Sequence, residues 1–147
     1  MPNPVAISVK QPWAALLVAG LKTIEVRRWP TRRRGRVLIH AAKLTDERPE
    51  VWARIGTAEL ERAAGLCGGI VGVGEITACR TYASADRFAV DTGLHLNAPD
   101  WFEPPWLFGF VFRDTRAVTF YPYTGQTMFF TVDGLTLPTV EPGVSLG

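Results

Sequence analysis

Lys22, Glu25 and Arg27 place an amine, a carboxylate and a guanidinium in one short segment, an arrangement suited to acid–base or binding chemistry. Residues two apart on a strand share a face, so Glu25 and Arg27 are expected side by side, close enough to pair. Burial would lower the pKa of Lys22 and make it a reactive or substrate-contacting amine, with Glu25 as a general base. The plainer interpretation is a solvated lysine beside a structural ion pair, because a buried carboxylate needs a cationic partner. The sequence leaves both interpretations open.

Positive charge is concentrated in the segment that contains these residues. Between Lys22 and Lys43 there are eight basic residues and one acid, so the segment carries +7 while the whole chain carries +2. A localised positive field attracts polyanions by releasing their counterions, and Trp29 adds an aromatic surface for stacking a base. The residues predicted to contact nucleic acid are Arg27, Arg28, Trp29, Arg32, Arg33, Arg34, Arg36, Lys43 and, from a later loop, Tyr123.

A strand, a helix and a second strand are expected to position these side chains. Residues 5–9 have the composition of a strand, and residues 11–20 that of a helix with an early proline and a left-handed stop at Gly20. Residues 22–29 alternate with period two, which is typical of a strand. A loop then leads to a further strand over residues 37–41.

The rest of the chain predicts one long strand and several shorter elements. Residues 70–82 are the strongest strand candidate, and residues 46–64 have helical periodicity that Gly56 weakens. The remaining elements are expected as a helix over residues 85–92 and strands over residues 106–112, 118–121 and 128–132. This pattern predicts an α+β fold, a small barrel or curved sheet of about five or six mostly antiparallel strands with helices around it.

The composition is that of a globular protein, with 47% hydrophobic and 20% charged residues among 147. We expect a single domain over residues 1–147, with a core over about 5–132 and a loose tail over 137–147. Cys67 and Cys79 are expected to be buried thiols, and we expect no metal and no cofactor. No apolar run is long enough for a membrane span and no signal peptide is recognisable, so we expect a cytoplasmic protein.

The segment over residues 7–43 resembles the ASCH domain, a module first described at the C-terminal end of activating signal cointegrator-1. The matching elements are Gln11-Pro12-Trp13, the motif Gly20-x-Lys22-x-x-Glu25-x-Arg27, Trp29, Arg34-Gly35 and His40-Ala41-x-Lys43. Residues 69–79 and 106–125 resemble the later strands of the family, so the resemblance covers about residues 5–132.

The resemblance implies a PUA-like β-barrel with a cleft beside the motif. With this cleft we associate Gln11, Trp13, Thr23 and His40, although His40 lies among apolar neighbours and is also explained as a core histidine with a satisfied hydrogen bond. The resemblance further implies binding of RNA or another nucleic acid. Certain small bacterial members are amidohydrolases of N4-acetylcytidine, and a ribonuclease activity has been described for others.

The sequence departs from the amidohydrolase pattern. Those members use the motif lysine, a threonine three residues after it and a glutamate from elsewhere. Lys22 matches the lysine, but Glu25 occupies the position of the threonine, and Thr23 has the wrong offset. Where relatives have a tryptophan in the last strand, this chain has Phe129 and Phe130, which keep an aromatic ring without the indole N–H.

Three classes of function therefore remain. The first is nucleic-acid binding, to RNA in preference to DNA, through Lys22, Arg27, Trp29 and the loop of residues 32–36. The second is a hydrolase of a modified nucleoside, or a ribonuclease, with Lys22 and Glu25 as catalytic residues. A modified-base reader without turnover and a protein-interaction adaptor are further alternatives. The sequence does not decide whether the protein is an enzyme, and it does not indicate an oligomeric state.

Overall fold

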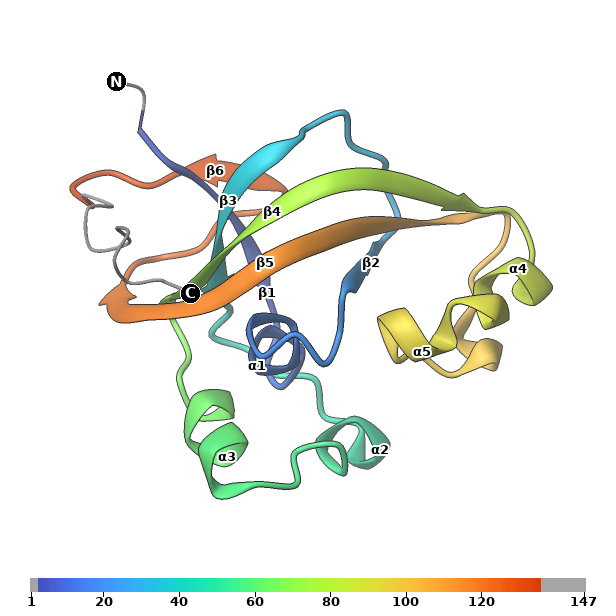
Figure 1. Ribbon diagram of the computed structural model, residues 1–147, viewed down its shortest axis with the longest axis horizontal. Helices are drawn as coiled ribbons and strands as arrows, with labels where there is room; N and C mark the ends of the chain where they lie inside the picture. Colours follow the sequence, from blue (N-terminus) through green and yellow to red (C-terminus); the bar gives the residue numbers. More distant parts are fainter. Residues whose placement is uncertain (1–2, 136–147) are drawn as a thin grey trace.

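The computed structural model describes residues 3–135, and its centre is one six-stranded sheet (Figure 1). The strands are β1 Val5–Val9, β2 Ile24–Arg27, β3 Gly35–Ala41, β4 Gly69–Tyr82, β5 Leu107–Pro122 and β6 Phe129–Thr131. They are ordered β2-β5-β4-β3-β1-β6. Only β1 and β3 run parallel, and every other neighbouring pair is antiparallel. The predicted α+β fold with a mostly antiparallel sheet is confirmed.

Short helices pack at two places along the sheet. They are α1 Trp13–Val18, α2 Pro49–Trp52, α3 Ala58–Ala64, α4 Ala85–Val90, α5 Thr92–His95 and the 3-10 helix η1 Pro99–Trp101. Figure 1 shows α1, α2 and α3 on one side of the sheet, with α4 and α5 at the far end of the long β4–β5 hairpin. As expected, the chain after α1 turns at Gly20 with a positive φ of 80°. None of the helices in the described part of the chain is long and apolar enough to cross a membrane.

The two edges of the sheet, β2 and β6, are bridged by side chains. Among residues 3–135 these strands do not pair through their backbones, so hydrogen bonding does not close the expected barrel. The Arg27 guanidinium donates to the carbonyl oxygen of Ser8, on β1, over 2.7 Å. The ring of Trp29, just after β2, lies edge-on to Phe129 of β6, with centroids 5.6 Å apart. The sheet therefore curls until side chains from its two ends meet.

Two expected elements differ in the structure. The single helix over residues 46–64 is two helices, because the chain breaks around Gly56 and Thr57 caps α3, accepting from the Leu60 N–H at 3.1 Å. The two strands expected over residues 106–121 are one continuous strand, β5. The polar stretch between them holds a bulge at Asp114, whose φ is 54°, so the apolar pattern is interrupted while the pairing with β4 continues.

The core lies between α1 and the concave sheet. Leu16 and Leu17 of α1 are buried with Ile7 of β1 and Phe110 of β5. This packing fixes where α1 ends and therefore where the chain enters β2. The expected loose tail over residues 137–147 lies outside the described residues.

Candidate functional site

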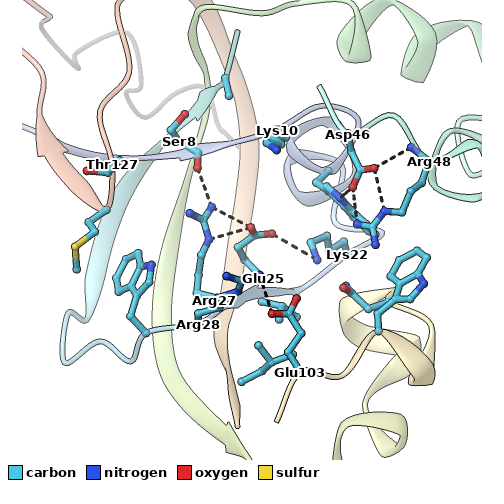
Figure 2. A pocket seen from close by; sticks show the side chains of 18 of the residues that line it. Ser8, Lys10, Lys22, Glu25, Arg27, Arg28, Asp46, Arg48, Glu103 and Thr127 are labelled. Atoms are coloured by element: carbon cyan, nitrogen blue, oxygen red, sulfur yellow. Dashed lines mark hydrogen bonds and ion pairs between the residues drawn. The ribbon is translucent and has the colours of Figure 1, made fainter. Parts of the chain in front are cut away.

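A cleft of about 870 Å³ lies beside the edge strand β2. Its walls come from β1, β2, α1, residues 46–48, residues 97–103 around η1, and residues 126–128 before β6. Figure 2 shows Glu25 in its middle, between Arg27 and Lys22. We call Lys22, Glu25 and Arg27 the charged row. No three His, Cys, Asp or Glu side chains gather to hold a metal ion anywhere in residues 3–135.

Lys22 is almost completely buried, with 1% of its surface exposed. Its Nζ donates to the carbonyl oxygen of His95 at 2.8 Å, lies 3.5 Å from Glu25 Oε1 and sits 4.5 Å above the Trp13 ring. Strict alternation would put Lys22 and Glu25 on opposite faces, but Lys22 precedes β2 and its side chain escapes that rule. Burial lowers the pKa of Lys22 to about 8, because the charged form loses its hydration.

Glu25 holds both cations of the charged row. Its Oε2 accepts two hydrogen bonds from Arg27, at 3.1 Å from Nε and 2.9 Å from Nη2, and its Oε1 faces Lys22. The predicted pairing of Glu25 with Arg27 is confirmed. With only 8% of Glu25 exposed, one buried carboxylate pairs with two cations and neutralises only one of their charges, so the charged row keeps a net charge of +1.

Aromatic side chains form the wall of the cleft next to Arg27. Trp29 packs edge-on against Phe110 at 5.1 Å and against Phe129 at 5.6 Å, so its ring is fixed by contacts to two strands. Phe129 thus occupies the place in the last strand where sequence comparison anticipated an aromatic ring. Arg28 is exposed at the rim and pairs with Glu103 at 2.8 Å.

The opposite wall contains Trp101 together with Asp46 and Arg48, two residues that the sequence did not indicate as part of the site. Arg48 donates to both carboxylate oxygens of Asp46, at 3.0 and 2.6 Å, and its guanidinium lies 3.8 Å from the centroid of the Trp101 ring. Asp46 also accepts from the indole N–H of Trp13 at 2.8 Å. The hydrogen bond from Arg48 holds the pKa of Asp46 far below its usual range. Residues 46–48 fall at the start of the helix expected over residues 46–64, and helical periodicity alone gives no signal for this pair.

Trp13 lies in the cleft as expected, but Gln11 and Thr23 do not line it. The Gln11 side chain is fully buried and ties α1 to α3 by donating to the carbonyls of Ala63 and Leu66, both at 2.9 Å. Thr23 joins its neighbours through its backbone, donating to Leu94 and accepting from the Phe112 N–H. Both residues support the site from outside.

His40 and Tyr123 also lie outside the lining of the cleft. His40 is buried, with Nε2 2.7 Å from the carbonyl oxygen of Tyr123 and Nδ1 2.9 Å from Ser8 Oγ. A carbonyl only accepts, so Nε2 carries the proton and Nδ1 accepts from Ser8. Burial lowers the pKa of His40, which keeps it neutral. The interpretation of His40 as a satisfied core histidine is confirmed.

The arginines after Trp29 lie on the surface beside the cleft. We call Arg32, Arg33, Arg34 and Arg36 the arginine loop, of which Arg36 is already on β3 and lines a second hollow with Glu75 and Asp114. All four are exposed, and within residues 3–135 none of them forms an ion pair with a carboxylate. Arg33 lies over the Phe129 ring at 5.2 Å, which links the loop to the Trp29 wall. Lys43 is exposed and does not line the cleft.

Comparison with known proteins identifies the family. A family model described as the ASCH domain matches residues 7–127. The chain belongs to the ASCH domain family. Over 35 residues it is 57% identical to human activating signal cointegrator 1, a match that covers 24% of this chain and 6% of that protein. Family membership indicates nucleic-acid binding in general.

Solved ASCH structures share the fold. The ASCH protein of Zymomonas mobilis matches with a TM-score of 0.61 at 17% identity, covering 90% of this chain and 89% of that one. A single-residue variant of the same protein matches with a TM-score of 0.62 at 16% identity, covering 91% and 92%. In this ASCH domain the motif residues Lys22, Glu25 and Arg27 line the cleft, whereas Gly20 lies in the turn that leads to them.

Proposed function

We propose that this ASCH domain binds nucleic acid, RNA in preference to DNA, with a base in the cleft and the phosphate backbone on the arginine loop. The observation that carries the proposal is that the exposed arginine loop adjoins, through Arg33 and Phe129, the Trp29 wall of a cleft of about 870 Å³. Guanidiniums without carboxylate partners attract phosphates and release the counterions of the nucleic acid.

The cleft itself has mixed charge, which suits a base better than a phosphate. Cationic donors from Lys10 and the charged row share it with the carboxylates of Glu25, Asp46 and Asp100. Such groups can donate to and accept from the edges of a base, and Trp29 offers a ring for stacking. Carboxylates can also accept from a ribose 2′-hydroxyl, which DNA lacks, and this supports the preference for RNA.

A titration over salt concentration tests the proposal. Single- and double-stranded RNA and DNA of one sequence are titrated at low salt, and the tightest ligand is then measured over a salt series. Each phosphate contact to a single strand contributes about 0.7 to the slope of log K against log salt, so changing all four loop arginines to Gln should lower the slope by roughly 3. Arg62→Gln with Arg87→Gln removes exposed arginines elsewhere and should leave the slope nearly unchanged. Absence of binding to all four ligands would refute the proposal.

A second candidate function is hydrolysis of a modified nucleoside or of RNA. The observation that favours it is Lys22, a cleft lysine whose pKa is lowered to about 8 beside a carboxylate. Against it, Glu25 replaces the threonine of the amidohydrolase members, and both of its oxygens are engaged by cations. A panel of acylated cytidines and labelled RNA tests this candidate. Turnover that is lost in Lys22→Ala and Glu25→Ala supports it, whereas binding without product indicates a reader.

A further inference from the structure

The cleft has two unlike ends. In Figure 2 Thr127 lies at one side and Arg48 at the other, with the charged row between them. Trp29 stands at the Thr127 end, because it contacts Phe129 of the neighbouring strand β6. Trp101 stands at the other end, beneath the guanidinium of Arg48. An elongated ligand would therefore have an aromatic ring near each of its ends.

The Arg48 end is crossed by side-chain contacts. Arg48 is held by Asp46 and stacked on Trp101, and Asp46 is bound in turn by Trp13. These contacts join residues 46–48 to η1 and α1 across this end. The charge of Arg48 is neutralised by Asp46, and the exposed carboxylate of Asp100 adds negative charge to the same wall. A polyanion therefore gains no electrostatic attraction by extending beyond Arg48.

The Trp29 end leads to the arginine loop. Phe129 joins the two, because Trp29 packs against one part of its ring and the guanidinium of Arg33 lies 5.2 Å from its centroid. Phosphates that leave the cleft on this side meet cations, whereas phosphates at the other side would meet the neutralised Asp46–Arg48 pair and the carboxylate of Asp100. The cleft thus has a polarity of charge along its length.

We propose that the cleft receives the unphosphorylated end of a single-stranded RNA. The terminal base lies beside Trp101, and the chain leaves past Trp29 onto the arginine loop. This inference rests on the proposed function and adds which part of the RNA enters. A terminal phosphate would be repelled by Asp100, whose charge Arg48 does not compensate, whereas a terminal hydroxyl donates a hydrogen bond to a carboxylate.

The Arg48 guanidinium covers one face of Trp101, and the half-buried indole also lines the cleft, so a terminal base would contact the part of the ring that Arg48 leaves open. A guanidinium is planar, and it rests 3.8 Å from the centroid of this ring. Nucleobases stack on indole rings in the same way and without regard to sequence, so a terminal base can use Trp101 whatever its identity.

Competition between linear and circular RNA tests the inference. An internally labelled single-stranded RNA is bound to the protein at low salt, and unlabelled competitors of one sequence displace it. The circle has no end, so it should compete about tenfold less well than the linear form, the loss expected for one unstacked base. Linear competitors with a phosphate on the 3′ end or on the 5′ end then identify the entering end, because only one of these phosphates should weaken competition.

Two outcomes overturn the inference. If the circle competes as well as the linear RNA, or if neither terminal phosphate changes competition, the cleft does not take a chain end, although the proposed function still stands. If no linear RNA binds at low salt, the proposed function fails and the inference fails with it.

Variants provide a second test on the same assay. Asp100→Asn should reduce the discrimination against the terminal phosphate, and Trp101→Ala should reduce the difference between linear and circular RNA. Trp106→Ala is the matched control, because Trp106 is 52% exposed and does not line the cleft. Equal discrimination in Trp101→Ala and the unchanged protein would contradict the assignment of the terminal base to Trp101.

Discussion

At the scale of single residues, the charged row is an ion triad in which one carboxylate faces two cations. Among residues 3–135, Glu25 is the sole anion in contact with Lys22 and Arg27. The lowered pKa of Lys22 means that its surroundings oppose its charge more than Glu25 supports it. A buried lysine whose surroundings disfavour its charged form is typical of a functional position, since packing alone would favour an apolar side chain.

Substitutions of Glu25 and Lys22 should therefore differ in their effect on the free energy of unfolding. Glu25→Gln leaves Lys22 and Arg27 without a counter-charge and should lower the free energy of unfolding by about 3 kcal/mol. Lys22→Met removes a poorly hydrated charge, leaves Glu25 paired with Arg27, and should change it by less than about 1 kcal/mol. Urea unfolding at neutral pH measures both. Glu103→Gln, at the exposed pair with Arg28, is the control and should have an effect below about 0.5 kcal/mol. Equal losses for Glu25→Gln and Lys22→Met would contradict this account.

The lowered pKa of Lys22 should also make the free energy of unfolding depend on pH. The pKa of Lys22 is about 8 in the folded protein and 10.5 as its ordinary value. Between these values the unfolded chain holds a proton that the folded chain has released, so a rise in pH across this window increases the free energy of unfolding. Below pH 8 the buried charge of Lys22 lowers the free energy of unfolding by its full amount, and above pH 10.5 this destabilisation is absent because the lysine is neutral in both states.

Urea unfolding from pH 7 to 11 checks this prediction, with Lys22→Met as the reference because it cannot titrate. The difference in unfolding free energy between the two proteins should grow in favour of the unchanged protein from pH 8 upward. A flat difference would show that burial does not lower the pKa of Lys22.

At the scale of elements, the position of α1 decides whether the site forms. The helix rests on β4 at Gly72, where an added Cβ would lie 2.5 Å from Val18 Cγ2 and 2.9 Å from the Arg116 carbonyl oxygen. The absence of a side chain lets α1 approach the sheet. Because Trp13 opens this helix and Lys22 follows its end, the close approach at Gly72 places both residues against the cleft.

Gly72→Ala should therefore destabilise the protein by about 1–3 kcal/mol through overpacking, and it should weaken ligand binding by displacing α1. Thermal unfolding and RNA titration measure the two effects. Gly56→Ala is the control, since nothing lies within 4 Å of its added Cβ and its φ is not positive. Equal stability of the two variants would contradict the tight packing of α1 on β4.

The sequence predicted the elements that have a clear period and missed contacts between distant segments. Alternation was enough to place Glu25 beside Arg27, because both lie within β2. It could not place Lys22, whose partner His95 belongs to a helix that joins β4 to β5. The stack of Arg48 on Trp101 was missed for the same reason. Continuity of β5 was hidden by the polar bulge at Asp114, where pairing with β4, rather than hydrophobic pattern, maintains the strand.

At the scale of the whole molecule, the curled sheet and the cleft are one structure. The edge strand β2 is joined to β6 by the Trp29–Phe129 contact and to β1 by the Arg27 hydrogen bond to Ser8, and these same side chains line or support the cleft. Closing the sheet and building the site therefore depend on the same few interactions. Hydrogen bonds between long strands, β3 with β4 and β4 with β5, hold the rest of the sheet independently.

Trp29→Ala should loosen the two edges without unfolding the centre of the sheet. Amide hydrogen exchange in β2 and β6 should accelerate by about tenfold, whereas exchange in β3 and β4 should remain close to that of the unchanged protein. Mass spectrometry of peptides from these strands measures the difference, with Trp106→Ala as a control for loss of an exposed indole. Uniform acceleration over all strands would indicate general destabilisation instead.

The hydrogen bond from Lys22 to the carbonyl of His95 has a consequence for protein engineering. The connection from β4 to β5, residues 83–106, supplies one wall of the cleft and lies at the end of the β4–β5 hairpin (Figure 1). Such a connection can be replaced without changing the strands that carry it. Grafting a different connection is a route to new ligand preference on an unchanged scaffold. Any graft must present a backbone carbonyl where His95 now does, because the lysine beneath it would otherwise lose its acceptor. The carbonyl oxygen of His95 is thus the one main-chain atom whose position a redesigned connection must keep.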